Sequence, residues 1–127
     1  MNILGIESTA HTLGIGVADD SGKILSNQWD MFVPEEGGIT PRMAADHHVE
    51  VFQDVLEKGL KEAGCRLQDI DAFAFSQGPG LGPCLRIGAT GARYLSKKYK
   101  KPLIGVNHCI AHIEVGKLVT GAKDPVV

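Results

Sequence analysis

Residues 2–18, NILGIESTAHTLGIGVA, decide the fold class, because they form two strand-like runs around one polar turn. Residues 2–7 are rich in β-formers, and residues 12–18 alternate large apolar side chains with glycine or alanine, which is the period of a strand. A turn signal at residues 19–22 leads into a third strand-like run at residues 23–33. Three strands joined by short turns predict an antiparallel meander.

A helical period begins after Thr40 and Pro41. Thr40 is predicted to cap the helix with its side chain, and Pro41 suits the first helical position. Through residue 63 the apolar residues recur at intervals of three and four, and Gly64 stands where a left-handed cap would end the helix. The sequence therefore predicts one long amphipathic helix over residues 41–63.

The remaining elements alternate between strand and helix. We expect a short apolar strand at residues 70–76, a Gly/Pro loop at 77–83 and a second helix at 84–99. A buried strand at residues 103–106 would follow, and then a third helix that begins after Asn107 and runs to about residue 118. The later strands would join the meander through crossover helices.

The resulting order, βββαβαβα, is that of the ribonuclease-H-like half-domain, from which actin, sugar kinases and heat-shock ATPases (the ASKHA fold) are built by duplication. This likeness concerns the fold and not the function. In that architecture two lobes face each other, and nucleotide binds in the cleft between them. We therefore expect an α/β fold in which residues 1–127 form a single N-terminal lobe, with the C-terminal lobe absent.

The composition sets outer bounds on function. With 127 residues and a net charge of −2, the chain is the size of one domain and has no global positive field, which argues against a self-sufficient RNA-binding module but leaves room for a local patch. Three widely spaced cysteines and no signal peptide favour a reduced, cytoplasmic setting. The apolar runs are too short to span a bilayer, so no membrane association is expected.

His108 and His112 are the sharpest chemical feature. If this segment is helical, the two imidazoles lie on one face with β-carbons about 5–6 Å apart, a spacing that can bring both rings to one metal ion. Two histidines on an exposed helix face explain the pattern about equally well, and a catalytic metal needs a third protein ligand. Because Cys109 stands where zincins carry their glutamate, a metalloprotease is a distant third possibility.

Two loops could approach a substrate. Glu7, Thr9 and His11 surround the first turn, where hydroxyls and amides could hold phosphate oxygens and Glu7 could position water or a metal. The loop at 77–83 is glycine-rich, but its prolines lack an amide hydrogen and its spacing is not that of a dinucleotide-binding loop. A rigid structural turn is the plainer interpretation of that loop.

Four positions on the first two helices suggest a partner surface. Val51 and Val55 widen the apolar stripe of the first helix beyond what one sheet contact needs. Gly88 and Gly91 lie inside the second helix, where glycine costs about 1 kcal/mol relative to alanine and usually marks close packing. These features predict a tightly packed helix pair with apolar surface left for a partner protein.

Taken together, four motifs in fixed order resemble the tRNA threonylcarbamoyladenosine synthase family, formerly regarded as O-sialoglycoprotein endopeptidases. The motifs are residues 5–14, 45–48, 74–83 and 105–112, so the resemblance covers essentially the whole chain. The archaeal and eukaryotic branch, which works in the KEOPS complex, is the more similar one.

The resemblance implies a specific chemistry. Members transfer a threonylcarbamoyl group from its adenylate to the adenosine beside the anticodon, in tRNAs that read codons beginning with A. His108 and His112 would bind one iron or zinc ion together with an Asp from the second lobe, and the nucleotide loop would also lie in that lobe. Glu7, Thr9 and His11 match positions near the substrate.

The resemblance also implies partners. A small dimerising KEOPS subunit would dock on the helices at residues 46–63 and 85–94, and a kinase-like ATPase subunit would bind mainly through the missing lobe. This chain alone is then expected to be inactive on tRNA, to retain metal poorly and still to bind the dimerising subunit. The alternative is a non-catalytic module whose activity is docking itself.

Overall fold

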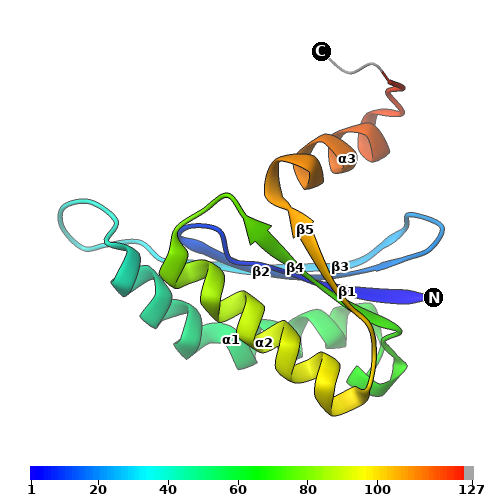
Figure 1. Ribbon diagram of the computed structural model, residues 1–127, viewed down its shortest axis with the longest axis horizontal. Helices are drawn as coiled ribbons and strands as arrows, with labels where there is room; N and C mark the ends of the chain where they lie inside the picture. The colour runs from blue at the N-terminus through cyan, green and yellow to red at the C-terminus, as the bar shows by residue number, and fades with distance from the viewer. Residues whose placement is uncertain (125–127) are drawn as a thin grey trace.

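The computed structural model describes residues 1–124 as one mixed sheet of five strands with helices on both of its faces (Figure 1). The strand order across the sheet is β3-β2-β1-β4-β5. The first three strands are antiparallel, and β4 and β5 run parallel to β1. The strands are β1 (Asn2–Glu7), β2 (Thr12–Asp19), β3 (Ile24–Met31), β4 (Ala72–Gly78) and β5 (Leu103–Asn107).

The helices occupy the predicted places in the chain order. They are α1 (Pro41–Ala63), the short 3-10 helix η1 (Leu67–Asp69), α2 (Gly82–Tyr99) and α3 (His108–Thr120). The predicted order βββαβαβα is therefore confirmed, and the element boundaries agree to within about two residues. The one element that the sequence analysis did not predict is η1, a single turn before β4.

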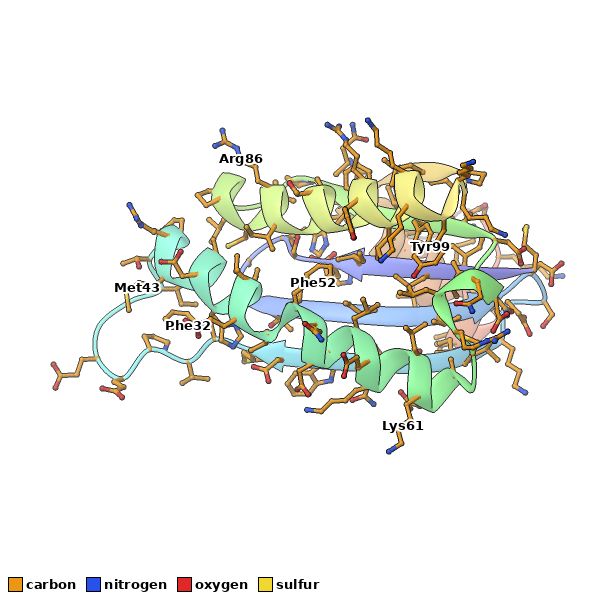
Figure 2. The ribbon with its side chains drawn as sticks, turned by 90° about the horizontal axis from the view of Figure 1, so that it is seen from below. Phe32, Met43, Phe52, Lys61, Arg86 and Tyr99 are labelled. Atoms are coloured by element: carbon orange, nitrogen blue, oxygen red, sulfur yellow. The ribbon has the colours of Figure 1, made fainter. Side chains whose placement is uncertain are left out.

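The core lies between the sheet and the helix pair α1–α2, which cover the same face (Figure 2). Leu4 of β1 and Leu13 of β2 are fully buried there, and Phe73 of β4 meets Tyr99 at the end of α2, with ring centroids 6.4 Å apart. The alternation seen in residues 12–18 is what directs every second side chain of β2 into this core.

The helix ends are set by different devices. α1 begins at Pro41 as predicted, but the predicted Thr40 side-chain cap is wrong, because that side chain makes no capping hydrogen bond. Gly64 does end α1 in the left-handed conformation, at φ 66°. Asn107 caps α3 as predicted, since its side chain accepts from the amides of Cys109 and Ile110 at 2.9 and 3.2 Å.

The two helix glycines do mark close packing. A Cβ at Gly88 would overlap the Ser8 side chain at the end of β1, and one at Gly91 would overlap the ring of Phe52 on α1. Val55 and Gly88 are buried within the lobe, so the prediction that they form spare surface is wrong: they pack in the lobe's interior. Val51 and Gly91 are half-buried.

The other face of the sheet is much barer. α3 stands over that face in Figure 1, and none of its residues is buried. β5 was predicted to be a buried strand, and this is wrong: Leu103 and Ile104 are exposed because β5 forms the sheet edge and α3 contacts it only at one end. Within residues 1–124, no helix combines the length and the apolar character that crossing a membrane requires.

Candidate functional site

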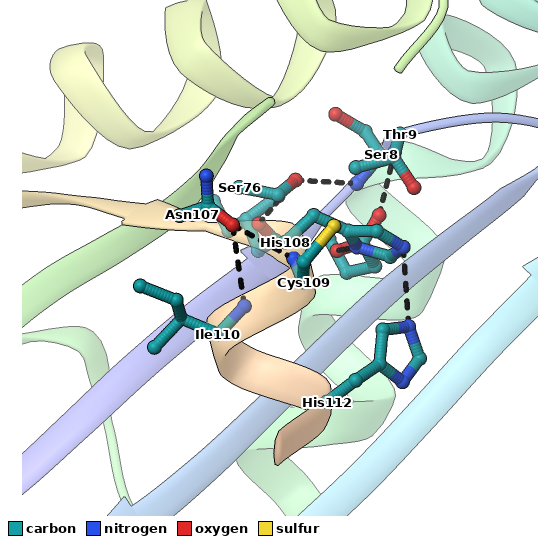
Figure 3. A network of polar contacts seen from close by, with 10 residues as sticks. Ser8, Thr9, Ser76, Asn107, His108, Cys109, Ile110 and His112 are labelled. Atoms are coloured by element: carbon teal, nitrogen blue, oxygen red, sulfur yellow. Dashed lines mark hydrogen bonds and ion pairs between the residues drawn. The ribbon is translucent and has the colours of Figure 1, made fainter. Parts of the chain in front are cut away.

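The topology brings residues from both ends of the chain to one edge of the sheet. Glu7 is the last residue of β1, and His108 follows directly after β5. Because β1, β4 and β5 are parallel, their carboxyl-terminal ends lie at the same end of the sheet. Ligand sites of α/β folds commonly lie at this end. Figure 3 shows the polar contacts that result.

His108 lies between a carboxylate and a second imidazole. Its Nδ1 is 3.0 Å from Oε2 of Glu7, and its Nε2 is 3.1 Å from Nε2 of His112 (Figure 3). An ionised carboxylate can only accept, so the proton of a neutral His108 ring belongs on Nδ1 and its Nε2 carries a free lone pair. Glu7 therefore fixes the tautomer of His108 and points its lone pair at the neighbouring ring.

This arrangement fits one half of a metal centre. Two imidazole nitrogens that share a tetrahedral zinc at about 2.0–2.1 Å lie roughly 3.3 Å from each other, and His108 and His112 are close to that separation. Glu7 occupies the position of the carboxylate that commonly backs a metal-binding histidine. In residues 1–124 no group of three His, Cys, Asp or Glu side chains is arranged to hold a metal ion, so a metal bound by this pair would need a third protein ligand from elsewhere. An N–H···N hydrogen bond between the rings fits the same distance.

The turn between β1 and β2 packs against the Gly/Pro loop at residues 77–83. The Thr9 amide donates to Oε1 of Glu7 at 2.6 Å, and the Thr9 carbonyl accepts from the Leu81 amide at 2.7 Å. A Cβ at Gly80 would lie 2.5 Å from the Thr9 carbonyl oxygen, so only glycine allows this approach. The loop therefore acts as a turn that holds the strand end carrying Glu7.

A second polar cluster, formed by His47 and His48 of α1, contacts the turn between β1 and β2. His48 is fully buried, and its Nε2 donates to the carbonyl of Ala10 at 2.9 Å, while His47 contacts Asp30 at 2.8 Å. Burial lowers the pKa of His48 below its ordinary value. His11 is not brought to Glu7 and His108: its carbonyl accepts from the Phe32 amide, and its side chain makes no hydrogen bond within residues 1–124.

An open groove of about 450 Å³ runs from the Glu7–His108 pair along the bare face of the sheet. Gly5, Gly14 and Gly16 are among its lining residues, and Gly5 of β1 pairs directly with Gly16 of β2. Ala111 of α3 and Trp29 of β3 also line it. The sequence analysis missed this groove, although the glycines at every second position of β2 were a signal for it.

The contact between Glu7 and His108 was missed as well. The two residues are 101 positions apart, and only the parallel pairing of their strands brings them together. The expected βββαβαβα order already implied that both lie at strand ends on one edge, so the topology could have predicted the pair.

Comparison with known proteins gives consistent results. The model of the tRNA N6-adenosine threonylcarbamoyltransferase family matches residues 23–127. A Thermofilum pendens protein of that name is 54% identical over 126 residues, and one from Thermococcus gammatolerans is 55% identical; both alignments cover 99% of this chain and 38% of the relative. A probable bifunctional tRNA threonylcarbamoyladenosine biosynthesis protein of Methanobrevibacter smithii is 54% identical over 123 residues. The chain thus spans about 38% of the length of the first two relatives.

Solved structures share the fold. YeaZ from Pseudomonas aeruginosa superposes with a TM-score of 0.73 at 19% identity, over 95% of this chain and 50% of that one. Thermus thermophilus RuvC, solved with a Holliday junction substrate, gives a TM-score of 0.56 at 15% identity and covers 83% of that chain. At these identities the likeness concerns the fold alone, and it agrees with the ribonuclease-H-like architecture predicted from the element order.

Proposed function

Because the chain belongs to the tRNA N6-adenosine threonylcarbamoyltransferase family, we propose that it forms the N-terminal lobe of such an enzyme. The reaction would attach a threonylcarbamoyl group, taken from its adenylate, to the adenosine next to the anticodon of tRNAs that read codons beginning with A. The observation that carries the proposal is the convergence of His108 and His112, with Glu7 behind His108.

Each residue of the site has a separate task in this proposal. His108 and His112 would hold one iron or zinc ion, with an Asp of the second lobe as the third protein ligand. Bound metal supplies Lewis-acid polarisation of the threonylcarbamoyl group. Glu7 keeps His108 in the tautomer whose Nε2 is free, and the Thr9 amide holds Glu7 in place. The rigid loop at 77–83 keeps this turn from shifting.

The assembly is also a proposal. The dimerising KEOPS subunit would bind the outer faces of α1 and α2, and the kinase-like ATPase would bind mainly through the second lobe, within the cytoplasm. Exposed apolar side chains on α1 support a docking face: Met43 and Val49 are each more than half exposed. Val51 and Gly91 border that face, whereas Val55 and Gly88 cannot take part from the interior.

A chimera tests the enzymatic proposal. This chain would replace the matching 126 residues of the Thermococcus kodakarensis relative, which is 54% identical there, and threonylcarbamoyl transfer to tRNA would be measured with the partner subunits present. We expect transfer in the chimera and a loss of 100-fold or more with His108→Ala or His112→Ala, on the order of what a metal ligand contributes.

Cys109→Ser is the matched control, because Cys109 lies between the two histidines on α3 and is exposed. It should leave transfer within about twofold. Transfer that survives both histidine substitutions would show that the pair does not hold a catalytic metal.

A docking module remains the second candidate, supported by the exposed apolar side chains on α1. It predicts a defined complex with the dimerising subunit in size-exclusion chromatography, even when the chimera shows no transfer. Val49→Lys should weaken that complex, whereas an exposed residue of α3 such as Val119→Lys should leave it intact.

A further inference from the structure

The charges of this chain are strongly segregated along the sequence. Residues 72–113 contain six Lys or Arg and no Asp or Glu, whereas the rest of the chain contains seven basic and fifteen acidic residues. The net charge of −2 is therefore the sum of a charge of +6 on residues 72–113 and a charge of −8 on the rest of the chain. Such asymmetry within one domain marks a surface suited to a polyanion.

The structure gathers most of these positive charges at one end of α2. Four of the six side chains are exposed there, and two tyrosines lie among them. Lys98 Nζ is 5.5 Å from the ring centroid of Tyr94 and 5.7 Å from that of Tyr99. Figure 2 shows Tyr99 at the C-terminal end of α2, with Arg86 at the opposite end of the helix. We call the basic patch the set Arg93, Tyr94, Lys97, Lys98, Lys100 and Lys101.

Little of this charge is neutralised by the protein. Within residues 1–124, Lys101 is the one patch residue in an ion pair, at 3.8 Å from Asp71. Three basic residues outside the patch are paired with acids at shorter range: Lys58 with Asp54 at 2.6 Å, Arg66 with Asp69 at 3.1 Å, and Lys117 with Glu114 at 3.1 Å. Lys97 and Lys98 complement the dipole at the end of α2, but Arg93 lies before the last turn and Lys100 lies beyond it. Helix stabilisation alone therefore does not account for the patch.

We propose that the basic patch binds the sugar-phosphate backbone of the tRNA substrate, an inference that rests on the proposed function. Unpaired Lys and Arg contact phosphates, and an exposed tyrosine between them offers a face on which a base can stack. Measured along α2 from its start near the turn beside Glu7, Arg93 lies at roughly 17 Å and Tyr99 at roughly 26 Å. The patch would therefore grip the tRNA away from the adenosine that is modified.

The test measures tRNA binding without transfer. An unmodified tRNA transcript would be titrated with this chain by fluorescence anisotropy at several salt concentrations. In the triple variant Lys97→Gln, Lys98→Gln, Lys100→Gln, we expect affinity to fall tenfold or more at low salt. The slope of log K against log salt should decrease by about 2, since each lost phosphate contact removes roughly 0.7–0.9. Tyr94→Ala should weaken binding several-fold with an unchanged slope.

The matched control is the triple variant Lys23→Gln, Lys58→Gln, Lys61→Gln, which removes the same charge from other parts of the lobe. Circular dichroism would verify that both triple variants fold. Equal loss in the two triple variants, or unchanged binding in the patch variant, would overturn the inference. Competition by polyglutamate as strong as that by RNA would also overturn it, because the patch would then suit an acidic protein. If the chimera is active but substitution of the basic patch does not change tRNA binding, the tRNA-binding inference is wrong and the transferase proposal is unaffected.

Discussion

Glu7 uses its two carboxylate oxygens for different purposes. One contacts Nδ1 of His108 at 3.0 Å, and the other accepts from the Thr9 amide at 2.6 Å. The side chain is thus fixed at both oxygens, so it can determine which nitrogen of His108 carries the proton. Loss of a carboxylate that hydrogen-bonds to a metal-binding histidine typically lowers metal affinity by about 10- to 100-fold.

Glu7→Gln should therefore weaken zinc binding by the chimera by about 10- to 100-fold while both histidine ligands remain. The amide can still accept from Thr9, but it no longer holds the His108 tautomer as a carboxylate does. Zinc affinity would be measured by competition with a chromogenic chelator. Glu35→Gln, at an exposed loop position, is the control and should bind zinc as the parent does. Equal affinity in all three proteins would remove Glu7 from the metal centre.

His48 should make the stability of the lobe depend on pH. Burial holds its folded-state pKa below the ordinary value of about 6.5, so the unfolded chain takes up a proton more readily than the folded one. This contribution to stability is complete above about pH 6.5 and is lost as the pH falls toward the lowered pKa.

The check is the urea midpoint of this chain at pH 7.5 and at pH 5.5. His48→Gln keeps a donor for the Ala10 carbonyl without a titrating ring, so it should lose less stability between the two pH values than the parent. The same decrease in both proteins would place the pH dependence in other groups.

At the scale of single residues, the sequence predicted contacts between residues that are close together along the chain. The pair His108 and His112 could be predicted because four residues along a helix return to the same face. The Glu7–His108 contact could not be read from spacing, because it depends on the register of three strands. His11 differs from its neighbours in the turn: within residues 1–124 its side chain makes no hydrogen bond to Glu7 or His108, and it does not line the groove.

At the scale of elements, the glycines of α2 and α3 have different purposes. Gly88 lies against Ser8 at the end of β1, where an added Cβ finds no space, whereas Gly116 on α3 has no atom within 4 Å of an added Cβ. Gly88 brings α2 close to the strand end that positions Glu7.

Gly88→Ala should destabilise the lobe by about 1–3 kcal/mol, because overpacking against Ser8 outweighs the gain in helix propensity. Gly116→Ala should stabilise it by up to about 1 kcal/mol, since only the propensity changes. Chemical denaturation at pH 7.5 gives both values. A stabilised Gly88→Ala variant would mean that α2 can move away from β1 without cost.

Element types were predictable because the chain changes period at its boundaries, from two in β2 to three and four in α1. Burial was less predictable. Residues 103–106 looked like a buried strand because they are apolar, yet β5 is the sheet edge, and edge position is decided by the order of all five strands. The Thr40 cap failed for a similar reason: residue type permits a cap, but backbone geometry decides whether the hydroxyl reaches an amide.

At the scale of the whole molecule, the proposed site of this chain would supply two ligands, His108 and His112, where a catalytic metal needs at least three. We therefore expect the isolated chain to retain less than about 0.1 equivalents of iron or zinc after dialysis. It should also transfer no threonylcarbamoyl group to tRNA, and the chimera should retain close to one equivalent. Elemental analysis by mass spectrometry measures both. Stoichiometric metal in the isolated chain would contradict the half-site interpretation.

The mixed sheet also constrains how quickly the lobe can form. β1, β2 and β3 pair with their neighbours in sequence, so short loops close before much chain entropy is lost. β4 reaches β1 only when Ile3 meets Ala72 across the whole of α1. Local pairings form faster than distant ones, so the hairpins should assemble early and the parallel strands late. The edge that carries His108 would then be the last part of the sheet to gain protection from hydrogen exchange during refolding, after the Thr9 turn is already in place.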